Sequence, residues 1–284
     1  MNNESIYEIT FNPIEWRRYI SVSDECIAEL LIEQFRYFSF CKNSVSGHKA
    51  CVKIFLDAEL YTVWDYETDV AYEKLTRDEM LSIFGVLVFK LKDNYENEKF
   101  WILHAGACVS DNNKLVVLVG PTHAGKSTLT TQLVASGRFT YLTDDSLAYD
   151  KATGKFIGFP RPITLRSTKL LDERISYVHF DKNGTEFFGL KNHFMSSGVM
   201  EYNEIVIFCI CREKIEGAEG MVFRTIPKSN LMMYFILNAM NGKKISENHM
   251  IARRLCGEGL VSAYSVSGYE GDEAYKIICR EVLE

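Results

Sequence analysis

The sequence predicts an α/β protein, and three features of the chain support this fold class. An apolar run of β-forming residues at 114–120 (KLVVLVG) leads into a short glycine-containing loop, and a helix-forming segment follows at 125–136. Two further strand-like runs, RFTYLTDD at 138–145 and EIVIFCICRE at 204–213, lie in the same part of the chain. With 284 residues, 47% of them hydrophobic, the chain can bury the core of one large domain or of two small ones.

Residues 1–95 are expected to form a small α+β module. The segment 51–66 (CVKIFLDAELYTVWDY) alternates and is rich in β-forming residues, which predicts strands. A helix is predicted over 75–93, with Thr76 as its N-cap and Glu79 completing a capping box three residues later. We consider this module a candidate for substrate recognition.

Residues 96–284 are assigned to the domain that carries the chemistry. The first elements expected there are a hairpin of buried strands (101–110 and 114–120, with a turn at 111–113) and a helix (125–136) ended by Gly137. Strands follow at 138–145 and 146–150, and the second of these pairs with 155–160 in another hairpin. The last elements are a buried strand (204–213) and an apolar helix (229–242), with Ser229 as its N-cap and Gly242 as its end.

The composition excludes several functional classes. The chain has 32 basic and 38 acidic residues, a formal net charge of −6, which argues against binding nucleic acid through a broad positive surface. Its eight cysteines are dispersed and form no C-x-x-C pair, so we expect reduced, buried thiols and no structural zinc site. No secretory signal is visible, and the longest apolar runs, 81–89 and 204–211, are too short to span a bilayer. We therefore expect a soluble, cytoplasmic protein without a nucleic-acid or membrane partner.

The loop between the strand and the helix carries the main motif. Residues 120–128 (GPTHAGKST) match the pattern G-x-x-x-x-G-K-[ST] in full, between a buried strand and a helix. Gly120 and Gly125 let the backbone wrap closely, so that amide groups can point at phosphate oxygens beside the positive end of the helix. Lys126 is expected to reach the β- and γ-phosphates of a nucleotide, and Ser127 to bind Mg²⁺. The alternative is a tight turn that matches the motif by chance.

The whole loop is therefore a candidate nucleotide site. Its residues are Gly120, Pro121, Thr122, His123, Ala124, Gly125, Lys126, Ser127 and Thr128. His123 either donates a hydrogen bond to phosphate or faces solvent, and a solvent-facing position is the simpler expectation.

An acidic pair follows the next strand-like run. Asp144 and Asp145 end RFTYLTDD, and a carboxylate beside a phosphate-binding loop can hold Mg²⁺ or accept a proton from an attacking hydroxyl. Because neighbouring residues of a strand point to opposite sides, each carboxylate can serve one purpose; the alternative is a solvated turn. His104, one strand upstream of the loop, is either a hydrogen-bonded core residue or part of this site.

Four segments in a fixed order connect these residues to a known family. They are LHAGACV (103–109), LVGPTHAGKSTL (118–129), YLTDDSLAYD (141–150) and FPRPITLR (159–166). Together they resemble the catalytic domain of bacterial HPr kinase/phosphorylase. They are more similar still to the HPr-kinase-related proteins encoded beside peptide-modification enzymes, which include lasso-peptide kinases.

The resemblance implies a fold and a set of roles. The implied fold is the P-loop kinase domain of the phosphoenolpyruvate-carboxykinase-like type, with a mixed sheet. In this family the loop binds nucleotide, the first aspartate of the pair is the base, and a histidine lies near it. Carried over by position, Asp144 is the base, His104 lies beside it and Lys126 acts on the transferred phosphate. Ser127 and Asp145 are then the expected metal ligands.

The chain departs from HPr kinases at two places. Thr128 stands where those kinases usually carry a glutamate, and their downstream glutamate-isoleucine-arginine-glycine signature is missing. In its place stands FPRP at 159–162, followed by Arg166, as in the related subfamily. Arg161 and Arg166 are tentative contacts for phosphate or an acidic substrate, or else a pair of surface arginines. The departures weaken HPr as the acceptor and weaken any phosphorylase activity.

The expected function is that of an ATP- and Mg²⁺-dependent kinase that phosphorylates a hydroxyl group. The family resemblance implies a serine of a peptide or protein as the acceptor. A small-molecule alcohol such as free serine, or a regulatory protein that binds nucleotide without catalysis, remains the alternative. The sequence leaves the oligomeric state open, with a homo-oligomer as one option.

Overall fold

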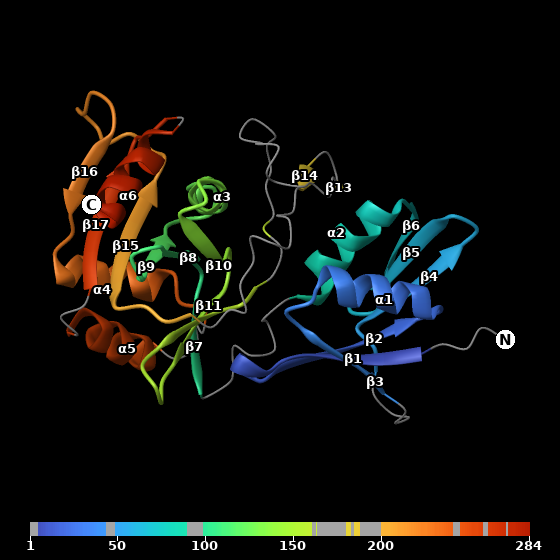
Figure 1. Cartoon of the computed structure of the whole chain (residues 1–284). Coiled ribbons are helices and arrows are strands. Elements are labelled where there is room, and N and C mark those ends of the chain that lie inside the picture. Colours follow the sequence, from blue (N-terminus) through green and yellow to red (C-terminus); the bar gives the residue numbers. More distant parts are fainter. Residues whose placement is uncertain are drawn as a thin grey trace. The chain divides into compact units, whose positions relative to one another are not determined.

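The chain divides into two compact units, each with its own mixed sheet, so the predicted α/β class is confirmed (Figure 1). Unit 1 holds the described residues of 1–92 and 175–192, and unit 2 holds those of 93–163 and 193–284. The computed structural model describes residues 5–43, 49–89, 99–160, 163, 180–182, 185–187, 200–240, 245–257, 261–270 and 272–284.

Unit 1 is built on a six-stranded sheet with the order β3-β1-β2-β4-β5-β6. Only the central pair β2–β4 is parallel. Its elements are β1 (Ser5–Phe11), the 3-10 helix η1 (Asn12–Ile14), β2 (Trp16–Val22), α1 (Glu25–Gln34), β3 (Ser39–Asn43), β4 (Val52–Asp57), β5 (Leu60–Asp65), β6 (Val70–Leu75), α2 (Arg77–Val88) and the small hairpin β13 (Phe180–Lys182)–β14 (Thr185–Phe187). Aromatic rings join the ends of α1 and α2 to the sheet: Trp16, Phe35, Phe38, Phe84 and Phe89.

The two sequence predictions for unit 1 are largely confirmed. The segment 51–66 forms the antiparallel hairpin β4–β5. Helix α2 begins at the predicted capping box, in which the Thr76 side chain accepts from the Glu79 N–H and the Glu79 carboxylate accepts from the Thr76 N–H. The predicted end of this helix was wrong, because the helix stops at Val88 and Phe89 turns into the aromatic cluster.

Unit 2 contains a second six-stranded sheet, with the order β10-β8-β9-β15-β17-β16, and a three-stranded sheet, β12-β11-β7. Its elements are β7 (Phe100–Leu103), β8 (Gly106–Ser110), β9 (Lys114–Val119), α3 (Lys126–Ala135), β10 (Phe139–Thr143), β11 (Leu147–Asp150), β12 (Phe156–Gly158), β15 (Glu204–Cys211), β16 (Val222–Thr225), α4 (Lys228–Leu237), α5 (Ile245–Gly257), β17 (Val261–Ser267) and α6 (Glu273–Leu283).

The strand directions bring several chain segments to one edge of the six-stranded sheet of unit 2. Strands β9, β15 and β17 are parallel, whereas β8 runs antiparallel to both β9 and β10. Strands β9, β10, β15 and β17 therefore all end at the same edge of the sheet, and β8 begins there. This edge positions the site described below.

Helices cover both faces of this sheet (Figure 1). Helices α3 and α6 pack together on one face, where Thr130 of α3 lies against Gly106 of β8. Helices α4 and α5 pack together on the other face, over a continuous core that includes Val117 of β9, Ile207 of β15 and Phe235 of α4. The sheet is thus a middle layer between two pairs of helices.

Two predictions for unit 2 need correction. The apolar run 101–110 was expected to be one strand, but it breaks at His104 and Ala105 into β7, which pairs with β11, and β8, which pairs with β9. The apolar helix α4 has Pro227 rather than Ser229 as its N-cap and ends at Leu237. Gly242, its predicted end, lies outside the described residues. The hairpins β8–β9 and β11–β12, helix α3 and strand β15 lie where they were predicted.

The structure describes the state of the cysteines and the length of the apolar helices. All eight cysteines are free, as expected, but Cys26 and Cys41 are exposed rather than buried. Within the part of the chain that the structure describes, no helix is both long enough and apolar enough to cross a membrane.

Candidate functional site

The loop between β9 and α3 has the backbone form of an anion-binding nest. The φ angle is +68° at His123 and +100° at Gly125, with a residue of negative φ between them. Alternation of left- and right-handed residues turns successive N–H groups toward one concave side, where they can bind an anion. A left-handed conformation at a residue other than glycine is uncommon, so the conformation of His123 marks a loop held by its surroundings.

Both motif glycines are required by close neighbours from other strands. A Cβ atom at Gly120 would lie 2.3 Å from the carbonyl oxygen of Ile210 in β15. A Cβ atom at Gly125 would lie 2.5 Å from the hydroxyl oxygen of Tyr269, which follows β17. The loop is therefore packed tightly against the ends of the two strands beyond β9, and its shape depends on them.

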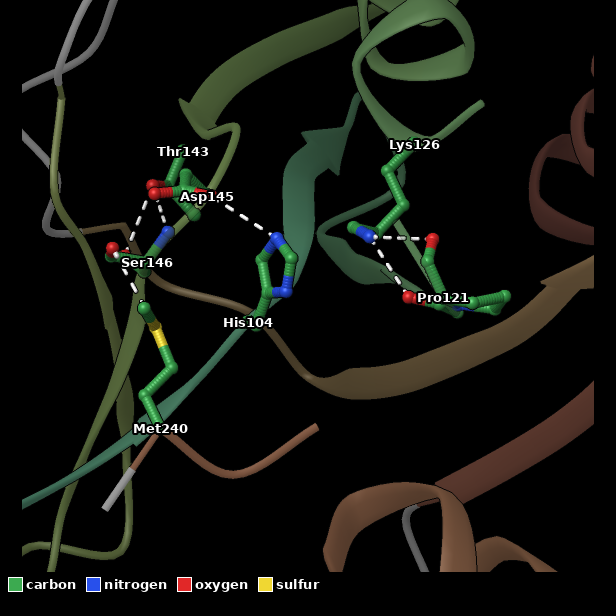
Figure 2. Close-up of polar contacts among 8 residues, drawn as sticks. His104, Pro121, Lys126, Thr143, Asp145, Ser146 and Met240 are labelled. Atoms are coloured by element: carbon green, nitrogen blue, oxygen red, sulfur yellow. Dashed lines mark hydrogen bonds and ion pairs between the residues drawn. The ribbon is translucent and has the colours of Figure 1, made fainter. Parts of the chain in front are cut away.

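Lys126 lies at the start of α3 and is almost fully buried, with 7% of its surface exposed. Its Nζ donates to the carbonyl oxygens of Gly120, at 2.8 Å, and Pro121, at 3.2 Å (Figure 2). Burial lowers the pKa of Lys126, and the negative charges of Asp144 and then Asp145 oppose this effect. Lys126 thus lies within the field of both carboxylates and can exchange its loop carbonyls for phosphate oxygens.

The acidic pair lies on a turn that Thr143 fixes. The buried Thr143 hydroxyl lies within hydrogen-bond distance of the carbonyl oxygens of Phe159, at 2.9 Å, and Ser146, at 3.0 Å, and its single proton can go to either. The Ser146 N–H in turn donates to the Thr143 hydroxyl. Asp144 is buried, with 6% exposed, whereas the Asp145 side chain is 34% exposed. The two carboxylates therefore occupy different environments, as adjacent residues at a strand end should.

His104 contacts the second carboxylate of the pair. Its Nε2 lies 3.1 Å from Oδ1 of Asp145, and Figure 2 shows the ring directed at that carboxylate. The His104 N–H donates to the carbonyl oxygen of Asn238 at 2.8 Å, which ties the residue to the segment after α4. His104 was expected beside Asp144, and the contact that the structure shows is with the adjacent Asp145.

The site is suited to Mg²⁺ bound together with a nucleotide. Ser127 lies half-buried on the first turn of α3, next to Lys126. Among the described residues, no three His, Cys, Asp or Glu side chains are grouped so as to hold a metal alone. Mg²⁺ usually takes one or two protein oxygens and completes its shell with water and phosphate. Ser127 and one aspartate fit that requirement.

The remaining predicted site residues differ in what the structure says of them. Pro121, Thr122 and His123 are exposed, Thr128 is half-buried, and Ala124 is buried. Ala124 accepts a hydrogen bond from the Tyr269 hydroxyl through its carbonyl oxygen. Arg161 and Arg166, the predicted substrate contacts, lie outside the described residues.

Sequence reasoning missed three residues at this edge: Thr143, Arg212 and Tyr269. Arg212 directly follows β15 and Tyr269 follows β17, so both reach the loop from strands distant in sequence. The only sequence signal for Arg212 is its place at the end of a buried apolar strand. That signal identifies no partner until the strand order is known.

Comparisons with known proteins give little further guidance. No family model matches the chain, and no curated protein matches it. Among solved structures, it is similar to the Hpr(Ser) kinase/phosphatase from Coxiella burnetii, with 14% sequence identity and a TM-score of 0.30. The match covers 64% of this chain and 87% of that one. A TM-score of 0.30 is too low to assign a fold or a function.

Proposed function

We propose that this protein is an ATP- and Mg²⁺-dependent kinase that transfers the γ-phosphoryl group of ATP to the hydroxyl group of a serine in a peptide or protein. The observation that carries this proposal is the arrangement at one sheet edge. There the loop and Lys126 lie within electrostatic reach of a carboxylate pair, one member of which, Asp145, lies 3.1 Å from Nε2 of His104. A nucleotide-binding protein without chemistry needs the loop but has no use for an oriented carboxylate beside it.

The loop and Lys126 would bind the phosphates of ATP. The amide groups of the nest and the positive end of α3 would surround the phosphate oxygens, and the Lys126 ammonium would turn from the Gly120 carbonyl to the transferred group. In phosphoryl transfer, charge spreads over the oxygens of the transferred group, so a fixed cation there stabilises the transition state more than the ground state.

Asp145 is the better candidate for the base that receives the proton of the acceptor hydroxyl. It is partly exposed, so an acceptor can reach it, and His104 holds its carboxylate in one orientation. The hydroxyl oxygen would bond to the γ-phosphorus as the bond from phosphorus to the β,γ-bridging oxygen breaks, giving ADP and a phosphoserine. The released proton would pass to Asp145. This choice reverses the order that the family resemblance implies.

Asp144 is then the better candidate for the metal side of the site. It is buried, and it has a larger effect than Asp145 on the pKa of Lys126, which indicates closer coupling to the phosphate-binding end. Asp144 and Ser127 would hold Mg²⁺, which, when bound, offsets the negative charge of the phosphates.

Other parts of the proposal rest on the sequence alone. The motif order favours a P-loop fold of the phosphoenolpyruvate-carboxykinase-like type for unit 2. It also favours a peptide acceptor of the kind modified by lasso-peptide kinases, with unit 1 as a candidate for peptide recognition. We expect this activity in the cytoplasm. The alternatives are a kinase for a small alcohol such as free serine and a nucleotide-binding regulator.

The test is a transfer assay with the purified full chain. The protein is incubated with ATP, Mg²⁺ and serine-containing peptides encoded by neighbouring genes, and mass spectrometry detects the mass of one added phosphoryl group. Lys126→Ala serves as the inactive control. Phosphorylation of free serine but not of peptides would establish the small-molecule alternative. ATP binding without transfer to either acceptor would support the regulatory alternative and contradict the proposed kinase.

A further inference from the structure

Arg212 is the first residue after β15, and the strand order places it beside the phosphate-binding loop. Strand β15 runs parallel to β9 and pairs with it from Glu204 to Cys209, so both strands end at the same edge. The loop leaves from the end of β9, and Arg212 leaves from the end of its neighbour. An exposed arginine is thereby held at the loop by the topology of the sheet.

The guanidinium group of Arg212 packs against the loop backbone immediately before Lys126. A Cβ atom at Gly125 would lie 3.1 Å from Nε of Arg212 and 3.3 Å from its Nη2. Only the absence of a side chain at Gly125 allows the guanidinium to come so close. Within the part of the chain that the structure describes, Arg212 forms no ion pair with a carboxylate, so its charge is available to an anion at the loop.

Tyr269 holds Arg212 in this position. The Tyr269 hydroxyl donates to the Ala124 carbonyl oxygen and lies beside the Arg212 guanidinium, since a Cβ atom at Gly125 would contact both groups. Burial raises the pKa of Tyr269, and the neighbouring Arg212 guanidinium opposes this effect. Because Tyr269 is 6% exposed and bonded to the loop itself, it fixes the distance between Arg212 and the loop.

The loop thus has two chemically different sides. On the side of β8 and β10 lie the two carboxylates and His104; on the side of β15 and β17 lie Arg212 and Tyr269. The phosphoryl group that is transferred has to face the carboxylate that takes the acceptor proton. The phosphates that remain on the nucleotide can then extend to the other side, where a cation would offset their charge.

We propose that Arg212 is a nucleotide-binding residue that contacts the phosphates retained in ADP, and that Tyr269 positions it. This inference rests on the proposed function, since it presupposes that the loop binds ATP. A guanidinium offers parallel N–H donors that match two phosphate oxygens, which a lysine at the same place would not provide. Arg212 contributes to binding ATP and ADP alike and leaves the chemical step to the opposite side of the loop.

The test compares the affinities of the full-length protein for ADP and ATP by calorimetry in the presence of Mg²⁺. Arg212→Gln should weaken both by the same factor, about tenfold to a hundredfold, as expected for loss of a hydrogen-bonded charge. Arg212→Lys should recover part of the loss. Arg224→Gln, which removes an equally exposed arginine from the edge strand β16, is the matched control and should bind like the wild type.

Steady-state kinetics separate binding from chemistry. Arg212→Gln should raise KM for ATP by a similar factor and leave kcat nearly unchanged, because a contact made equally in the ground state and the transition state affects binding alone. Tyr269→Phe should cause a smaller loss, about threefold to tenfold, in affinity for both nucleotides. Combined with Arg212→Gln it should add little, since the two residues act through one contact.

The failures of this inference and of the proposed function are distinguishable. If the wild type binds neither nucleotide, both fail. If the wild type binds, Lys126→Ala does not, and Arg212→Gln binds ADP like the wild type, the inference fails while the nucleotide site stands. A loss confined to ATP, or a fall in kcat at unchanged KM, also overturns the assignment to the retained phosphates. The assignment is also overturned by a combination of two results. One is a melting temperature of Arg212→Gln, without nucleotide, far below that of Arg224→Gln; the other is that Arg212→Lys recovers no affinity.

Discussion

The Nε2 atom of His104 lies 3.1 Å from Oδ1 of Asp145, and this contact joins two connecting segments, each of which links the three-stranded and the six-stranded sheet of unit 2. His104 occupies the junction between β7 and β8, and Asp145 lies on the turn after β10. A carboxylate held by a histidine in this way has a fixed orientation while remaining open to a substrate. The contact therefore gives the Asp145 carboxylate an environment different from that of the adjacent Asp144, which suits the two aspartates to different functions.

The two aspartates should respond differently to the same substitution. Asp145→Asn removes the proton acceptor, so transfer should fall by about 10²–10⁴-fold with ADP affinity unchanged. Asp144→Asn removes a charge from the metal side, so its transfer should be partly restored by additional Mg²⁺. The measurement is phosphotransfer at several Mg²⁺ concentrations for each variant. The reverse pattern would assign the base to Asp144, as the family resemblance implies, and near-normal transfer in both variants would refute the kinase mechanism.

His104→Gln should reduce transfer without weakening nucleotide binding. Glutamine can still donate a hydrogen bond but lacks the ring that reaches Asp145 from this position, so the carboxylate loses its fixed orientation. We expect transfer to fall by about tenfold to a hundredfold, the range for a hydrogen bond to a charged group. Single-turnover assays with saturating ATP measure the effect. An equal loss of ADP affinity would instead show that His104 supports the fold of the loop.

The parts of the site that the sequence predicts are those with local signals. The strand, loop and helix around Lys126 and the capping box at Thr76 and Glu79 each depend on residues within a few positions of one another. Such patterns are set by the geometry of one turn of helix or one loop, so they can be recognised without knowing the fold.

The parts that could not be predicted depend on which strands are neighbours. Strands β7 and β8 are both buried along their whole length, so the apolar run 101–110 gives no sign of the break at His104. Arg212 and Tyr269 reach the loop only because β15 and β17 lie beside β9 in the sheet. Arg212 and Tyr269 lie 87 and 144 residues after Gly125 in sequence, a separation at which no local pattern specifies pairing.

Lys126→Met should abolish nucleotide binding without destabilising the free protein. Burial lowers the pKa of Lys126, which means that the folded state disfavours the charged form relative to the unfolded state. Between the lowered pKa and the ordinary lysine value, the unfolded chain binds more protons, so this residue makes the free energy of unfolding rise as the pH rises. Denaturant unfolding at several alkaline pH values should show that contribution in the wild type and its loss in Lys126→Met. A large fall in stability at neutral pH would contradict this reasoning.

Gly125→Ala should damage the loop far more than Gly137→Ala, although both glycines are left-handed, with φ values of +100° and +76°. Each substitution incurs the strain of that conformation, about 1–2 kcal/mol. At Gly137, which follows the C-cap of α3, Ser136, a Cβ atom meets nothing within 4 Å, so only that strain is expected, and ADP affinity should be unchanged. At Gly125 the Cβ atom would lie 2.5 Å from the Tyr269 hydroxyl, so that residue or the loop has to move. The nest and the contact that positions Arg212 are then disturbed together, and we expect ADP affinity to fall by more than about tenfold, as for loss of a hydrogen-bonded charge.

Calorimetry with ADP and thermal unfolding of both variants provide the comparison. Equal effects on affinity would show that left-handed strain, and not packing against Tyr269, determines the shape of the loop.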